Sequence, residues 1–411
     1  MRLVLVVSRF PQLSETFIAN KFAGLVDAGW DAHIVSAEEG SWDDFPRLAV
    51  RPELRRRVHR QWPHEPAWKA ALLWPLALMV TFLRSPQVTV RYWREGRKQL
   101  GHRVARRFYL DAAIVALSPD IIHFEFGSQG VERTDLGDLL GARLSVSFRG
   151  YDLNYVGLDD PDYYTELWRD VDAVHVLGQD LWRRALQRGC PADKPRAMIP
   201  PAIDVEMFCP AETDASRDAG PAGTMERPLR VLSVGRLEWK KGYEHGLAAI
   251  RHLTERGLAV EYRIVGGGTY FEPLIFACHQ LGLDDRVTFL GPQPHGAVVE
   301  HMRWADVFLH PAVSEGFCNA VLEAQAMRLP VVASDADGLA ENVDDGRTGF
   351  VVPRRDPAAM ADKLALLAGD GALRQLMGAA GRERVERCFT LPQQIAEFDR
   401  FFREVVSRHA R

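Results

Sequence analysis

Two carboxylates, Glu315 and Glu323, are the side chains of this sequence whose type and spacing most clearly suggest chemistry. Residues 307–310 have the short apolar pattern of a buried strand, and the residues after Glu315 have the spacing of a helix packed against a sheet. The pair is therefore expected at a strand-to-helix turn. There each ionised carboxylate can accept hydrogen bonds from two sugar hydroxyls. The plainer alternative is that Glu315 caps the helix and Glu323 meets a buried arginine.

The backbone at this turn favours an anion. The first N–H groups of a helix have no partner within it, and they lie at the positive end of the helix dipole. Three residues are expected to present such groups: Gly316, Phe317 and Cys318.

Two other loops carry cations and glycines. The loop after the expected strand 230–234 has a glycine followed by two cations: Gly235, Arg236 and Lys241. The loop after the expected strand 262–265 has three consecutive glycines: Gly266, Gly267 and Gly268. Cations at the carboxyl end of a strand suit a diphosphate, and glycines let the backbone approach a phosphate or ribose closely. Ordinary turns use the same glycine triplet.

Length and composition indicate a globular protein of two domains. A chain of 411 residues exceeds one ordinary core and suits two domains of roughly 200 residues each. Hydrophobic residues make up 47% and charged residues 26%, which excludes extensive disorder. The 5 cysteines are widely spaced without a C-x-x-C pair, which favours a reducing compartment over disulfides or structural zinc. The apolar N-terminal run is too short for an export signal.

Short apolar runs alternate with helical patterns through most of the chain. The expected strands are residues 3–7, 32–36, 121–124, 145–148, 173–176, 197–199, 230–234, 262–265, 287–290, 307–310, 331–333 and 349–352. This alternation predicts an α/β protein whose two doubly wound, Rossmann-like domains face a cleft. The domain limits that we expect are 1–209 for the first domain, 210–228 for a linker, 229–389 for the second domain and 390–411 for a helix crossing back to the first domain.

In their order and spacing, these motifs resemble the donor-binding domain of retaining glycosyltransferases of family 4, which have the GT-B fold. The resemblance also rests on residues 286–291 and on residues 338–350. It covers about residues 228–388 and extends more weakly over the first domain. There, residues 8–18 resemble the opening of exopolysaccharide- and colanic-acid-type bacterial members.

The resemblance implies a role for each group of the second domain. Arg236 and Lys241 would hold the donor diphosphate, Glu323 the ribose hydroxyls and Glu315 the hydroxyls of the donor sugar. Three backbone amides would lie near phosphate and sugar: Phe317, Cys318 and Asn319. Negative charge grows on the diphosphate as the glycosidic bond breaks, so fixed cations stabilise the transition state. No metal and no cofactor are then expected besides a nucleotide-diphosphate sugar of UDP or GDP type.

Four residues of the first domain are further candidates. Ser14 either caps the first helix, the safer interpretation, or meets donor and acceptor hydroxyls. Relatives often carry histidine where Arg149 and Glu125 stand, and a guanidinium cannot accept a proton, so Arg149 is expected to bind a carboxylate, phosphate or hydroxyl. His123 is then the remaining imidazole, either functional or structural. Asp152 is expected as a polar contact at the reaction centre.

Residues 47–107 form a basic block of 15 basic and 3 acidic residues in a chain whose net charge is −4. A plain solvated face is one interpretation. A nucleic-acid surface is discounted, because interleaved exposed aromatics and a binding motif are lacking. The adjacent apolar stretch 70–83 is shorter than a membrane span and contains Pro75. We therefore favour a cytoplasmic protein associated peripherally with the anionic inner face of the membrane.

The function that we expect is retaining, metal-independent hexosyl transfer to a hydroxyl of a glycan or lipid-linked saccharide, in exopolysaccharide or related glycoconjugate biosynthesis. One alternative is a nucleotide-sugar-binding GT-B protein without turnover. Others are a sugar-nucleotide epimerase and a transferase acting on a small natural product. Asp335 and Asp337 match a D-x-D metal pattern, but they fall in a turn and are expected to be structural.

Overall fold

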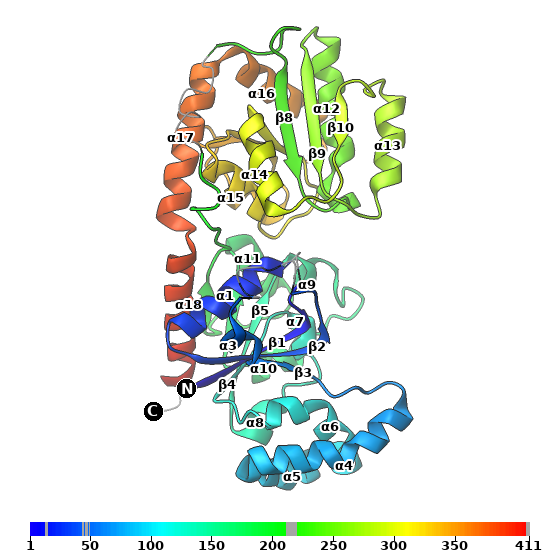
Figure 1. Ribbon diagram of the computed structural model, residues 1–411, viewed down its shortest axis with the longest axis vertical. Helices are drawn as coiled ribbons and strands as arrows, with labels where there is room; N and C mark the ends of the chain where they lie inside the picture. Colours follow the sequence, from blue (N-terminus) through cyan, green and yellow to red (C-terminus); the bar gives the residue numbers. More distant parts are fainter. Residues whose placement is uncertain (13–14, 43–44, 46–47, 49, 211–219, 408–411) are drawn as a thin grey trace. The chain divides into compact units, whose positions relative to one another are not determined.

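The computed structural model describes residues 1–12, 15–42, 45, 48, 50–210 and 220–407. The chain divides into two compact units (Figure 1). Unit 1 comprises Met1–Ile199 with Leu391–Arg411, and unit 2 comprises Pro200–Thr390. Each unit contains one sheet whose strands all pair in parallel, so the predicted α/β class with two Rossmann-like domains is confirmed. The predicted cleft concerns how the units face each other and stays a prediction.

The sheet of unit 1 has the strand order β3-β2-β1-β4-β5-β6-β7. Its strands are β1 (Arg2–Phe10), β2 (Asp31–Glu39), β3 (Val58–Arg60), β4 (Ile121–Phe124), β5 (Arg143–Phe148), β6 (Ala173–Val176) and β7 (Arg196–Met198). The central strands are mostly apolar and buried, because both faces of a parallel sheet are covered. The buried polar residues His123, Ser145 and Ser147 interrupt the apolar pattern of β4 and β5 and bond one another. β3 was not predicted. It is a short edge strand with one apolar residue, and it pairs only with β2.

Helices connect these strands. In unit 1 they are α1 (Thr16–Asp27), α3 (Pro52–Arg55), α4 (Ala67–Arg84), α5 (Pro86–Gln99), η2 (Gly101–Arg103), α6 (Val104–Val115), α7 (Gly127–Gly130), α8 (Leu136–Leu140), α9 (Gly150–Tyr155), α10 (Thr165–Asp170), α11 (Gln179–Gln187) and α18 (Leu391–Ser407). The predicted return of the C-terminal helix is confirmed, because α18 belongs to unit 1 and packs against α1. Phe402 buries its ring against Trp30, with the ring centroids 5.9 Å apart.

The sheet of unit 2 has the order β10-β9-β8-β11-β12-β13. Its elements are β8 (Leu229–Val234), η4 (Trp239–Lys241), α12 (Tyr243–Glu255), β9 (Val260–Val265), α13 (Phe271–Gln280), β10 (Val287–Phe289), α14 (His295–Trp304), β11 (Val307–His310), α15 (Asn319–Ala326), β12 (Val331–Ser334), η5 (Asp337–Glu341), β13 (Gly349–Val352), α16 (Pro357–Gly369) and α17 (Gly371–Cys388). Val307 and Leu309 join one buried cluster and Phe308 the other. Alternate residues of a strand point to opposite faces, so this sheet has a core on each face.

The division between the units lies between Ile199 and Pro200 rather than after Cys209. The reason is that the segment after Ile199 packs into unit 2. Ile203 and Phe208 are buried in the core of that unit, and the N–H of Ile203 donates to the carbonyl of Phe389 at 3.0 Å. Of the expected linker, residues 211–219 lie outside the described residues.

Candidate functional site

The candidate site of unit 2 forms where the strand order changes direction. β8 and β11 are neighbours in the sheet. The next strand after β8, β9, lies on one side of this pair, and the next strand after β11, β12, lies on the other side. Ligands of doubly wound sheets bind beyond the carboxyl ends of such a strand pair. The loop after β8 carries Lys241, and the loop after β11 carries Glu315. The two loops are bonded together, because the N–H groups of Val313 and Ser314 both donate to the carbonyl of Lys240, at 2.8 and 3.2 Å.

Gly242 allows the two loops to meet. It has φ 62°, in the left-handed region, and a Cβ atom there would collide with the carbonyl of Pro311. Only glycine therefore fits this position without a shift of the backbone. The close approach brings Lys241, the last residue of η4, next to the loop that follows β11.

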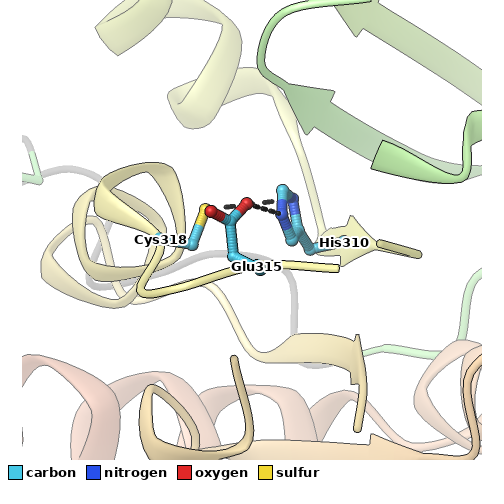
Figure 2. A group of neighbouring side chains, drawn as sticks. All are labelled: His310, Glu315 and Cys318. Carbon is cyan, nitrogen blue, oxygen red and sulfur yellow. Dashed lines mark hydrogen bonds and ion pairs between the residues drawn. The ribbon is translucent and has the colours of Figure 1, made fainter. Parts of the chain in front are cut away.

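Lys241, Glu315 and His310 form a buried polar cluster. The Lys241 ammonium makes an ion pair with Oε2 of Glu315, and the side chains are only 12% and 15% exposed. His310 is the last residue of β11, and its Nε2 lies 3.3 Å from the same oxygen (Figure 2). Among the described residues, Oε1 of Glu315 accepts no hydrogen bond. One carboxylate oxygen is thus held by the protein, and the other is available to a ligand hydroxyl.

The charges of this cluster stabilise one another. Burial alone would raise the pKa of Glu315, but Lys241 and His310 outweigh burial and hold it at about 2. Burial would lower the pKa of Lys241, whereas the charge of Glu315 raises it above its usual value. Burial also opposes protonation of His310, but Cys318 and Glu315 raise its pKa to about 9. The cluster therefore keeps Lys241 cationic and Glu315 anionic at neutral pH.

His310, Glu315 and Cys318 could also hold a metal ion. Their ligand atoms all lie within 4.8 Å of one another (Figure 2), which makes this the one such group in the described part of the chain. A histidine, a carboxylate and a thiol are ligands that zinc accepts. However, the Lys241 ammonium already neutralises the carboxylate, so a metal ion would compete with a built-in cation.

The loop from Glu315 to Cys318 is held by residues of the following segment. The side-chain amide of Asn342 accepts from the N–H of Cys318 at 3.1 Å and donates to its carbonyl at 3.0 Å. Asp337 accepts from the backbone N–H of Glu315 at 3.3 Å. These bonds fix the loop without using its remaining amides.

This loop corrects one expectation. The helix α15 begins at Asn319, with Cys318 at the N-cap position, later than predicted. The Cys318 amide is not free for an anion, because Asn342 accepts from it. Within the described residues, the N–H groups of Gly316, Phe317 and Asn319 have no partner. These are the amides that this helix N-terminus can offer to an anion.

Glu323 lies in the second turn of α15 and is half-buried. Its carboxylate accepts no hydrogen bond and forms no ion pair with any residue that the structure describes. Burial without such a partner raises its pKa from 4.5 to about 7. The alternative of a buried arginine partner for Glu323 is therefore wrong. A desolvated carboxylate without a partner is costly unless a ligand supplies the hydrogen bonds.

Arg236 differs from Lys241 in exposure. Its side chain is 58% exposed, and its guanidinium lies 2.9 Å from Oε1 of Glu238. Glu238 also binds Lys240, at 3.0 Å. Arg236 is thus loosely held at the mouth of the loop after β8, where it can turn toward an anion.

The glycines of unit 2 have a packing role as well. Cβ atoms on Gly266 and Gly268 would collide with the carbonyls of Gly235 and Leu237. In addition, the carbonyl of Gly267 accepts from the N–H of Leu237 at 2.9 Å. The glycine turn therefore joins the loops after β8 and β9.

The candidate residues of unit 1 meet around Glu125, at the carboxyl end of β4. Glu125 is fully buried and forms ion pairs with Lys21 of α1 and with Arg149, the latter at 3.0 Å. The Arg149 guanidinium also lies 3.9 Å from the ring centre of Phe17. Arg149 does bind a carboxylate, as expected, but it is one from its own chain. Burial lowers the pKa of Lys21 to about 8, although Glu125 favours its charged form.

Asp152 does not lie at an open reaction centre. It is fully buried in α9 and accepts from the backbone N–H groups of Ser128 and Arg149, each at 3.2 Å. Burial raises its pKa to about 6, against the effect of those hydrogen bonds. We correct its expected role to a structural one, since its carboxylate holds two loop ends together.

His123 must also be corrected from a catalytic candidate to a core residue. It is fully buried in β4, and its two ring nitrogens bond the hydroxyls of Ser145 and Ser147, at 2.9 and 2.8 Å. Phe402 of α18 packs edge-on against its ring. Burial and the charges of Lys21 and Arg149 lower its pKa well below the usual value. The remaining candidate of this unit, Ser14, lies outside the described residues.

Several residues of these sites were not anticipated. His310 was assigned only to a strand end, although that edge of the sheet was expected to face the ligand. Lys21 has a clearer signal, because it stands within the apolar helical stripe of Ile18, Phe22 and Leu25. A lysine at such a position needs a buried acidic partner. Asp335 and Asp337 are structural, as predicted, since both carboxylates bind Arg354, at 3.2 and 2.9 Å.

Comparisons with known proteins agree with this geometry. The family described as glycosyl transferases group 1 matches residues 217–384. A colanic acid biosynthesis glycosyltransferase, WcaL of Escherichia coli K12, is 30% identical over 381 residues, which cover 89% of this chain and 90% of that protein. The amylovoran biosynthesis glycosyltransferase AmsK of Erwinia amylovora is 29% identical over 405 residues, which cover 95% and 96%.

A solved structure shares the fold. The structure of Anabaena Alr3699/HepE in complex with UDP and glucose aligns with a TM-score of 0.72 and 16% sequence identity. The alignment covers 98% of this chain and 100% of that protein. At this level of identity the likeness concerns the fold.

Proposed function

The chain belongs to the group 1 glycosyl transferases, and we propose that it moves a hexosyl group from a nucleotide-diphosphate sugar to a hydroxyl with retention of anomeric configuration. The donor that we propose is of UDP or GDP type, and HepE, a protein of the same fold, was solved with UDP and glucose. The acceptor is a glycan or lipid-linked saccharide in exopolysaccharide biosynthesis, the process for which WcaL and AmsK are named. The 5 cysteines are free, which favours the reducing cytoplasm.

The observation that carries this proposal is the unpartnered carboxylate of Glu323. It is desolvated, its pKa is raised to about 7, and it follows the loop that holds Glu315. Ribose hydroxyls can donate to Glu323, and hydroxyls of the transferred sugar can donate to the open oxygen of Glu315. Both groups are acceptors when ionised, which suits a ligand rich in hydroxyl donors.

Arg236 and Lys241 supply the positive charge in this proposal. As the bond to the sugar breaks, negative charge grows on the departing diphosphate. Lys241, which Glu315 already holds in place, stabilises that charge without reorganisation, whereas the exposed Arg236 turns toward it. A unit charge at ~4 Å with an effective dielectric constant of ~20 contributes about 4 kcal/mol. This corresponds to roughly a thousandfold in rate. The free amides of Gly316 and Phe317 add two donors, and no metal ion is required for this step.

Glu315 has a positioning role toward Lys241. Because the ion pair holds the ammonium in place before the donor arrives, Lys241 does not have to give up side-chain freedom on binding. The diphosphate then shares the cation with Glu315. The proton of the acceptor hydroxyl passes to an oxygen of the donor phosphate, so no side chain of unit 1 is needed as a base.

Thermal unfolding in the presence of UDP- and GDP-linked sugars tests the donor class. A ligand at 100 times its Kd adds about 2.7 kcal/mol to the unfolding free energy, which is readily measured. We expect one nucleotide class to stabilise the protein and to support turnover with an acceptor. The product linkage, read by NMR, should keep the anomeric configuration of the donor. Stabilisation without turnover on any acceptor would favour a nucleotide-sugar-binding protein, and inversion would refute the retaining mechanism.

A further inference from the structure

The helix α4 exposes large apolar side chains along one face. Over its 18 residues, six of them are exposed by 43–74%: Trp68, Leu72, Leu76, Met79, Phe82 and Leu83. At 100° per residue these positions fall within one stripe, which we call the apolar stripe. A surface helix of a soluble protein normally turns its polar face to water, so a continuous apolar stripe indicates an interaction surface.

The opposite face of α4 is also apolar, and it is already used. Ala77 and Thr81 are buried, and the indole of Trp74 donates to the carbonyl of Ala105, at 3.0 Å. α4 packs against both α5 and α6 (Figure 1). By length and composition, α4 is the one helix in the described part of the chain that could cross a membrane. Its packing on unit 1 instead favours a helix that lies in a membrane interface, because spanning would detach Trp74 and Ala77.

The charges next to the apolar stripe are predominantly positive. Residues 67–107 contain 9 basic residues and 1 acidic residue, Glu95. Lys69 and Arg84 lie near the two ends of the apolar stripe and are exposed. No described residue forms an ion pair with either of them, or with Arg103 and Arg106. Anionic lipid headgroups attract such cations beside a buried apolar face.

The arginines of the basic block that precede α4 contribute less positive charge to this surface. Arg51 pairs with Asp27 at 2.6 Å, and Arg57 pairs with Asp31 at 2.7 Å. Both aspartates lie outside the block, so counting charges over 47–107 overstates the positive charge of this surface. Three cations of α5 and α6 are likewise paired. Arg107 pairs with Asp135 at 2.7 Å, and Arg94 and Lys98 pair with Glu95. The positive charge beside α4 that no described acidic residue neutralises therefore includes that of Lys69, Arg84, Arg103 and Arg106.

An open cavity of about 1390 Å³ lies along the first half of α4. Ala70, Ala71 and Trp74 line it from α4, and Arg106, Tyr109 and Leu110 line it from α6. Its walls are mostly apolar, and apart from Tyr109 its charged or titratable lining residues are Arg106 of α6 and, ahead of α4, Glu65 and His64. Such a recess can accept a lipid acyl chain while Arg106 remains near the headgroup.

We propose that α4 lies flat on an anionic lipid bilayer, with its apolar stripe inserted among the acyl chains and its flanking cations among the headgroups. This inference goes beyond the transfer reaction and does not depend on turnover. It replaces the broad basic region 47–107 by a defined surface. It also places unit 1 at the interface where a lipid-linked acceptor would be found.

Vesicle flotation of the full chain, without donor or acceptor, tests the proposal. The probes are vesicles of phosphatidylcholine alone and of an equimolar mixture with phosphatidylglycerol. We expect flotation with the anionic vesicles only, weakened by added salt. The double variant Leu72→Glu/Met79→Glu should lose at least about tenfold in partitioning. The matched double variant Leu366→Glu/Leu376→Glu, at 46% and 69% exposed positions of unit 2, should float like the wild type.

A second variant separates charge from apolar insertion. Lys69→Ala/Arg84→Ala should weaken binding to anionic vesicles several-fold. The proposal is overturned if neither vesicle binds, if neutral vesicles bind equally well, or if Leu72→Glu/Met79→Glu floats like the wild type. It is also overturned if the apolar stripe joins two copies of the chain, seen as a dimer in analytical ultracentrifugation that this variant abolishes. Turnover of these variants on an acceptor in solution should be unchanged, so the outcome is independent of the proposed reaction.

Discussion

Glu323→Gln should stabilise the ligand-free protein while weakening donor binding. The pKa of Glu323 is raised from 4.5 to about 7, a difference of about 2.5 pH units between the unfolded and folded chain. At 1.36 kcal/mol per unit, the ionised carboxylate costs the folded state about 3 kcal/mol at pH 8. Glutamine has the same shape without the charge. It should therefore raise the unfolding free energy by about 2–3 kcal/mol at pH 8.

The sign of the pH dependence follows from proton uptake. Between pH 4.5 and 7 the folded protein binds a proton at Glu323 that the unfolded chain has released. The stability of the wild type therefore falls as the pH rises through this window, and the stabilisation by glutamine disappears near pH 4.5. Calorimetric unfolding at pH 5 and pH 8 should show a variant advantage of about 5–10 °C only at pH 8.

Donor binding should change in the opposite direction. With Glu323→Gln, the negative charge is lost and one of the two acceptor oxygens becomes an amide donor, so the thermal stabilisation by a nucleotide sugar should shrink. As a control, Glu226→Gln replaces an exposed carboxylate and should change stability by less than about 0.5 kcal/mol at either pH. Destabilisation of the protein by Glu323→Gln at pH 8 would show instead that the carboxylate has a partner within the chain.

Three other predictions concern the polar clusters. Lys241→Ala should lower the unfolding free energy in urea by about 3 kcal/mol by leaving Glu315 buried with only His310 beside it, and adding Glu315→Gln should restore most of it. If the double variant is no more stable than the single one, the ion pair is not the cause. Glu125→Gln should lower the unfolding free energy in urea by a similar amount, because it leaves Lys21 without its counter-charge. An unchanged urea midpoint would refute that pairing. Asn342→Ala should lower the unfolding free energy by about 2 kcal/mol and reduce the thermal stabilisation by a nucleotide sugar. If neither value changes, contacts other than those of Asn342 hold the loop.

Most of the fold could be predicted from the sequence because the strands of a parallel sheet are covered on both faces and are therefore mostly apolar. β4, β6, β11 and β13 have the predicted limits, whereas β3 was missed because a polar edge strand has no such pattern. The boundary after Ile199 was missed for a different reason. The segment that follows it joins unit 2 through contacts with residues far along the chain.

The candidate site could be predicted only in part. The loops after β8 and β11 follow from the alternation of strands and helices, and Arg236, Lys241 and Glu315 were named from local motifs. Pairings between distant residues have no local signal. The bonds from His123 to Ser145 and Ser147, across two strands, turned an apparent catalytic imidazole into a core residue. Burial, which sets the pKa of Glu323, likewise depends on the assembled unit.

The role of fixed cations in place of a metal ion is tested most directly by the initial rate of sugar transfer by the wild type and Arg236→Ala, each with and without EDTA. The Arg236 side chain is 58% exposed, so its loss should leave the thermal midpoint within about 1 °C. We expect a wild-type rate that EDTA does not change and a kcat that falls by about 10²–10³ in Arg236→Ala. Turnover abolished by EDTA, or a variant with the wild-type kcat, would contradict that role.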